Sequence, residues 1–147
     1  MLDNSLIGYR SGKRSITVEA GAVRFYAQAI GETDPIYHDV AAARQAGLRS
    51  LRVPPTFLSC LEGLLFETRA LLDIAKMDLK RLLHAEQSYV YHAPAFAGDT
   101  LTYEPQIVDI YDKKGGALEF LVKETRVTNQ DGVHIADLRA ALVQRQL

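Results

Sequence analysis

The chain has 147 residues, of which 48% are hydrophobic and 24% are charged, so we expect residues 1–147 to form one globular domain with its own core. Its formal net charge of -1, without a block of basic residues, argues against nucleic acid as a partner. The single cysteine, Cys60, excludes an internal disulfide and favours a reducing, cytoplasmic location.

The sequence predicts neither a signal peptide nor a membrane span. The first residues, MLDNSLIGYR, lack a basic segment followed by an apolar one. The most apolar stretch, FLSCLEGLLF, is interrupted by Glu62 and is shorter than the ~20 residues that cross a bilayer. We therefore expect no membrane partner.

Two helices are predicted in the first third of the chain. The first covers residues 17–30, with Thr17 as its N-cap and Gly31 at the position of a C-cap. Its helical spacing is carried by Val18, Ala22, Phe25 and Ala29. Asp39 can cap a second, short helix over residues 39–46.

A third helix is predicted after the pair Pro54 and Pro55, which can open a helix but not continue one. From Thr56 to about Phe66 apolar residues occupy nearly every side, so we expect other structure to enclose this helix. The next stretch, TRALLDIAKMDLKRLL, is amphipathic and predicts a second helical piece.

The second half of the chain has the two-residue period of strands. Four segments predict strands: HAEQSYVYH, TLTYEPQIVDIY, ALEFLVKETRVT and VHIADLRAALVQR. Residues 113–116 and 129–132 predict hairpin turns between the last three. One buried face is predicted from the alternation of Leu118, Phe120 and Val122 with Glu119, Leu121 and Lys123.

Burial requirements then indicate how these pieces combine. The sheet needs a cover for its inner face, and the apolar helix needs burial. Both needs are met by an α+β hotdog fold, in which a curved antiparallel sheet wraps a long central helix. Because the open edge of such a sheet favours pairing with another subunit, we expect a dimer.

Three fragments in order, AQAIGETDPIYHD, VPPTF and LHAEQSYVYHAPAFAGDTL, resemble the MaoC-like hotdog dehydratases, most closely the N-terminal MaoC dehydratase domain. The resemblance extends from about Leu6 to Val143. It implies (R)-specific enoyl-CoA hydratase activity, or dehydration of 3-hydroxyacyl thioesters carried on CoA or acyl carrier protein. We expect no cofactor and no metal.

The resemblance also maps the catalytic pair. Active members carry an aspartate and a histidine in a loop of the form Gly-Asp-x-Asn-Pro-Ile-His, and residues 31–37 lie over this pattern one for one, so the acid maps to Glu32 and the histidine to Tyr37. An imidazole titrates near neutral pH and can take a proton from water. A phenol, with an unperturbed pKa of about 10, stays protonated. Glutamate can replace aspartate as a base, but an error of about 1 Å in placing the water costs on the order of a hundredfold.

The oxyanion site differs as well. The resemblance implies that a backbone N–H at the start of the central helix, from a glycine after a histidine, binds the thioester oxygen. That glycine falls on Pro55, which has no N–H. Thr56 and Phe57 offer the next donors in the first helical turn, where free N–H groups favour negative charge. We therefore treat Thr56, Phe57 and His38 as candidate substrate-binding residues, with a surface role as the alternative for His38.

Other polar residues have simpler interpretations. Cys60 is expected in the core, and Gly98 with Asp99 is expected to form a turn. His92 and His134 have no spacing that suggests metal ligands. The apolar segment over residues 71–83 is expected to line an acyl tunnel or to pack in the core.

These observations lead to one preferred hypothesis and two alternatives. The preferred hypothesis is a subunit that binds the acyl chain of an acyl-CoA or acyl-ACP thioester, while a catalytically complete MaoC-like partner, as a heterodimer, supplies the Asp/His pair. The first alternative is a self-sufficient homodimeric hydratase that uses Glu32 and Tyr37. The second is a non-enzymatic module that binds acyl-CoA.

Overall fold

The computed structural model describes residues 1–66 and 68–146. Five antiparallel strands form one sheet in the order β1-β3-β4-β5-β2. The strands are β1 (Arg14–Thr17), β2 (Leu82–Tyr91), β3 (Thr100–Lys113), β4 (Leu118–Thr128) and β5 (His134–Arg145). The four predicted strands and both hairpins are therefore confirmed, and β1 is the strand that the sequence pattern missed.

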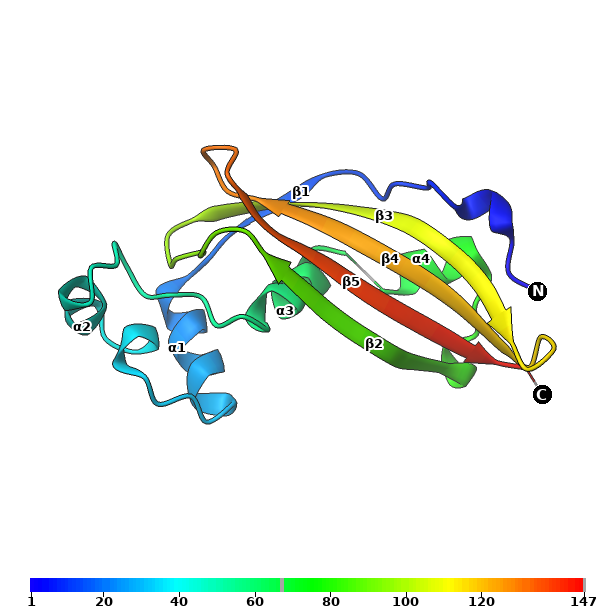
Figure 1. The fold of residues 1–147 in the computed structure, drawn as a ribbon, viewed down its shortest axis with the longest axis horizontal. Coiled ribbons are helices and arrows are strands. Elements are labelled where there is room, and N and C mark those ends of the chain that lie inside the picture. Colours follow the sequence, from blue (N-terminus) through cyan, green and yellow to red (C-terminus); the bar gives the residue numbers. More distant parts are fainter. Residues whose placement is uncertain (67, 147) are drawn as a thin grey trace.

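Four α-helices accompany the sheet: α1 (Ala20–Ala29), α2 (Val40–Gln45), α3 (Phe57–Leu65) and α4 (Thr68–Ala75). Short 3-10 helices cover Asn4–Leu6, Pro35–Tyr37 and Leu79–Arg81. In Figure 1 the long strands β3, β4 and β5 run side by side as a curved sheet, with α1 and α2 at one end and both termini toward the other. The α+β hotdog prediction is confirmed. No helix in the described part of the chain is long and apolar enough to cross a bilayer.

The start of α1 differs from the prediction. Thr17 is the last residue of β1, where it pairs with Thr100, and the N-cap position belongs to Glu19. The apolar spacing also indicated the wrong face of α1. Val23 and Ala27 are buried, whereas Phe25, which the spacing included, is exposed. The predicted helix end is confirmed, since Gly31 follows the C-cap with φ +73°, which glycine adopts at little cost.

Two apolar clusters fill the space between the helices and the sheet. The larger cluster surrounds α3 and includes Leu58 and Leu61 of the helix with Leu101 and Leu138 of the sheet. The smaller cluster packs α4 against strands β3 and β4. Each Å² of apolar area removed from water stabilises the fold by ~25 cal/mol, and this packing holds the curved sheet against both helical pieces.

The sheet face that contacts the helices is not the predicted one. Leu121 and Val127 of β4 lie in the apolar clusters, and Lys123 binds a side chain of α3. Phe120, which belongs to the predicted face, is buried on the side of the sheet away from the helices. There its ring stacks on Tyr111 at 4.7 Å between centroids. Burial of both faces in this part of β4 explains why alternation alone indicated the wrong side.

Helix α3 is less enclosed than predicted. Its buried residues are Phe57, Leu58, Leu61 and Glu62. Leu64 is 74% exposed and Cys60 is also exposed, so the expectation of a core cysteine was wrong. The sheet covers one side of this helix and leaves the other side apolar and uncovered.

Candidate functional site

The loop that carries Glu32 is held by its own side chains. The Glu32 carboxylate oxygen Oε1 accepts hydrogen bonds from the backbone N–H groups of Thr33 and Asp34, at 2.8 and 2.9 Å. Asp34 in turn caps the 3-10 helix Pro35–Tyr37, accepting from the Ile36 N–H at 3.1 Å. The predicted acid therefore stabilises the turn in which it lies.

Tyr37 is buried and His38 is half-buried at the end of this loop. Tyr37 is only 9% exposed. Nε2 of His38 donates to the carbonyl oxygen of Glu32 at 2.6 Å, and Arg24 Nε donates to the His38 carbonyl at 2.9 Å. His38 thus joins the two ends of the loop and also connects it to α1.

The N-terminus of α3 holds the two predicted backbone donors. The Phe57 N–H donates to the Pro54 carbonyl at 3.0 Å and is therefore already engaged. Thr56 occupies the N-cap, and its N–H has no acceptor within the described residues. The Thr56 side-chain oxygen lies 2.7 Å from the hydroxyl of Tyr26, whose ring contacts Phe57 at 4.7 Å between centroids.

Two further tyrosines, from β2, reach the same helix end. Tyr91 donates to the Pro55 carbonyl, and the Tyr89 hydroxyl shares a hydrogen bond of 2.6 Å with Ser59 Oγ. Burial raises the pKa of both tyrosines, and the nearby Tyr37 adds slightly to the increase in the pKa of Tyr91. These phenols remain protonated at neutral pH, so they can donate hydrogen bonds but not accept a proton from water.

A cavity of about 700 Å³ opens along α3. It begins near Ser59, one helical turn after Thr56, and extends to α4. Its apolar wall comes mainly from Phe66, Leu71, Ile74, Leu82 and Leu142. Leu71, Ile74 and Leu82 fall within the segment 71–83 that was expected to line a tunnel or to pack in the core. Glu32, Tyr37, His38, Thr56 and Phe57 do not line it.

One wall of this cavity is charged. Glu62 of α3 is 5% exposed, and its Oε1 accepts from Lys123 Nζ at 2.7 Å and from the Thr125 hydroxyl. Both strand residues belong to β4, so the contact ties the central helix to the middle of the sheet. A carboxylate at the centre of an apolar run was the sequence signal for this contact, but the sequence did not indicate its cation.

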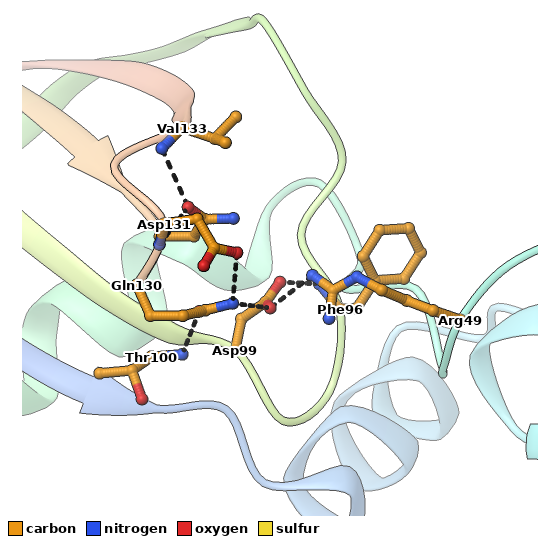
Figure 2. A network of polar contacts seen from close by, with 8 residues as sticks. Arg49, Phe96, Asp99, Thr100, Gln130, Asp131 and Val133 are labelled. Atoms are coloured by element: carbon orange, nitrogen blue, oxygen red, sulfur yellow. Dashed lines mark hydrogen bonds and ion pairs between the residues drawn. The ribbon is translucent and has the colours of Figure 1, made fainter.

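The Gly98–Asp99 turn, expected from the sequence, carries a polar network around the buried Asp99 (Figure 2). Asp99 accepts from the guanidinium of Arg49, from the Phe96 N–H at 2.8 Å and from Gln130 Nε2 at 3.2 Å. Arg49 also lies over the Phe96 ring, 4.4 Å from its centroid. The network fastens the loop between β2 and β3 to the β4–β5 hairpin, so its role is structural.

The structure brings together one group of metal-type ligands that sequence spacing did not suggest. Nε2 of His92 and Nε2 of His134 each lie 2.8 Å from a different oxygen of Asp137, and the ligand atoms of all three lie within 4.8 Å. Burial raises the Asp137 pKa, but the hydrogen bonds from the two imidazoles outweigh it and leave the pKa below its usual value. The two imidazole donors satisfy the carboxylate on the sheet face opposite α3, which accounts for the cluster without a metal.

Solved structures with the same arrangement include dehydratases. A structure described as a MaoC-like dehydratase has a TM-score of 0.85 at 22% identity, and covers 97% of this chain and 43% of that one. The truncated HadBC (3R-hydroxyacyl-ACP dehydratase) complex from Mycobacterium tuberculosis has a TM-score of 0.76 at 24% identity, over 94% of this chain and 96% of that one. At these identities the likeness establishes the fold, which is that of the MaoC-like hotdog dehydratases.

The sequence comparison identifies the family. Residues 5–138 match the family described as FAS1-like, dehydratase domain region, and the chain belongs to that family. A UPF0336 protein of Saccharopolyspora erythraea is 30% identical over 98% of this chain and 92% of its own length. Another from Thermobifida fusca is 32% identical over 84% of this chain and 80% of its own length.

Proposed function

We propose that this chain is the acyl-binding subunit of an (R)-specific enoyl-thioester hydratase or 3-hydroxyacyl-thioester dehydratase of the cytoplasm, and that a MaoC-like partner chain supplies the Asp/His pair. The observation that carries the proposal is the state of the loop over residues 31–38. The Glu32 carboxylate is bound by two N–H groups of its own turn, and a buried phenol occupies the position of the imidazole. A water molecule held there would lack the imidazole, the side chain that most readily takes a proton near neutral pH.

Two features of this chain support the binding of a thioester. The Thr56 N–H lies at the start of α3, and the N-terminus of a helix favours negative charge, which suits a polarised thioester oxygen. The cavity begins one turn later and has the volume and apolar walls that an acyl chain needs. Binding of the substrate is thereby separated from the proton transfers.

Two structural neighbours support a two-chain assembly. Besides the HadBC complex, the ChsH1-ChsH2 complex of Mycobacterium tuberculosis has a TM-score of 0.72 at 16% identity, over 96% of this chain and 99% of that one. Each is described as a complex of two differently named chains. We extend this arrangement to the present chain as part of the proposal.

The test is crotonyl-CoA hydration, measured for the purified chain alone and again after addition of a MaoC-like chain that has an intact Asp/His loop. We expect the lone chain to bind acyl-CoA in calorimetry but to hydrate crotonyl-CoA at least about a hundredfold more slowly than the mixture, because general acid–base catalysis contributes about 10² to 10⁴. Rapid hydration by the lone chain, abolished in Glu32→Ala, would overturn the subunit proposal. If Tyr37→Phe then lowered turnover without weakening thioester binding, the self-sufficient hydratase would be correct.

A further inference from the structure

The charged wall of the cavity is unusual for a site that receives only hydrocarbon. Glu62 and Lys123 both line the cavity, and they form an ion pair of 2.7 Å there. Placing an unsubstituted hydrocarbon against these groups removes water from them and gives no hydrogen bond in return. Such a wall therefore favours an occupant with a polar atom at this point.

This ion pair also has unused hydrogen-bonding capacity. Both donors to Glu62, from Lys123 and Thr125, reach the same oxygen, Oε1. Within the described residues Oε2 accepts no hydrogen bond, and the Lys123 ammonium group has three N–H donors, of which one is used there. The amide of Gln87, which also lines the cavity, has a buried Nε2 without a partner in the described part of the chain.

The position of the ion pair along α3 indicates where the polar atom must lie on the chain. Glu62 follows Thr56 by six residues, which corresponds to roughly 9 Å along the helix axis. An extended hydrocarbon advances slightly less than its ~1.5 Å bond length per carbon, so this distance corresponds to roughly seven carbons. The cavity lining also includes Leu71, Ile74 and Leu82, which offer apolar contacts to the rest of the chain.

We propose that the acyl chain bound here carries a hydroxyl group near its middle, which donates to Glu62 Oε2 and accepts from Lys123 Nζ. The inference rests on the proposed function, because it requires the thioester at Thr56 and the chain in the cavity. A hydroxyl group suits the pair better than a charged substituent does. A carboxylate would be repelled by Glu62 and an amine by Lys123, whereas a hydroxyl both donates and accepts.

The test compares two thioesters of equal length, dodecanoyl-CoA and 8-hydroxydodecanoyl-CoA, by calorimetry on the full chain. We expect the hydroxylated thioester to bind about tenfold to a hundredfold more tightly, as hydrogen bonds to charged groups produce. Because loss of one partner would leave a buried charge, the variant replaces both, Glu62→Met with Lys123→Met. The preference should disappear in this variant. The preference should persist in a control variant, Glu124→Met with Arg139→Met, which removes an exposed ion pair instead.

The outcomes separate this inference from the proposed function. If both thioesters bind equally well, or the unsubstituted one binds more tightly, the hydroxylated substrate class is wrong while acyl binding stands. If neither thioester binds, the acyl-binding function fails and the inference fails with it. The wild-type comparison decides the question even if the double variant does not fold.

Discussion

The Glu32 carboxylate accepts two backbone hydrogen bonds, so at the scale of single residues its nearest role is to hold a turn. The alignment of residues 31–37 with the catalytic loop could be found from sequence, because it depends only on residue order. The direction of the Glu32 side chain could not, since it depends on which N–H groups the folded turn presents. A residue that aligns with a catalytic position can therefore have a purely structural role, which is to stabilise its own loop.

Substitution of Glu32 distinguishes the two roles. We expect Glu32→Ala to lower the free energy of unfolding by about 1–2 kcal/mol, because two N–H groups lose a charged acceptor. Turnover of the two-chain complex should fall by less than about tenfold, far below the hundredfold typical of a lost general base. Urea unfolding and crotonyl-CoA hydration measure the two effects.

Glu32→Gln provides the matched control, since its amide oxygen can still accept from the same N–H groups. Its unfolding free energy should lie closer to that of the unsubstituted chain than that of Glu32→Ala does. A hundredfold loss of turnover in both variants, with stability unchanged, would show that Glu32 is catalytic.

At the scale of elements, the sequence predicted the parts that strong local patterns define. The long strands with glycine-rich turns were predicted within a few residues, as was the short helix capped by Asp39. The four-residue strand β1 was missed because it is too short for a period to develop, and its pairing with β3 is a contact between distant segments. Tyr89 and Tyr91 share one face of β2 by alternation, but the helix end that they contact depends on the tertiary fold.

The loop between β2 and β3 gives a prediction at this scale. Asp99 is 0% exposed and joins three partners from separate parts of the chain. We expect Asp99→Ala to lower the free energy of unfolding by about 3 kcal/mol, because the Phe96 N–H and the Arg49 guanidinium both lose their acceptor. Urea unfolding provides the measurement.

Asp131→Ala is the control for this change. Asp131 lies in the same network but is exposed, so its loss should change the unfolding free energy by no more than about 0.5 kcal/mol. Equal losses in the two variants would mean that burial of Asp99 does not determine the strength of the network.

At the scale of the whole molecule, the two sheet edges differ. The edge strand β1 is four residues long, whereas β2 has ten residues and exposes Leu83, Val90 and Tyr91. A long edge with unpaired backbone groups and apolar side chains favours pairing with a second chain. The uncovered side of α3, with Leu64, adds a further apolar surface to the same molecule.

We therefore expect Val90→Lys to weaken association of the chain, with itself or with a MaoC-like partner, by at least about tenfold, because the new charge must lose water when the edge is covered. Light scattering across a range of concentrations measures the dissociation. Val90 is 57% exposed, and Val133 in the β4–β5 hairpin is 45% exposed, so Val133→Lys makes the same chemical change away from the edge. Association that responds equally to both variants, or to neither, would place the subunit contact somewhere other than β2. An assembly through β2 would place Tyr91 of each protomer next to the second chain. Because Tyr91 donates to the Pro55 carbonyl at the start of α3, this contact would also bring the second chain close to the helix end where we propose that the thioester binds.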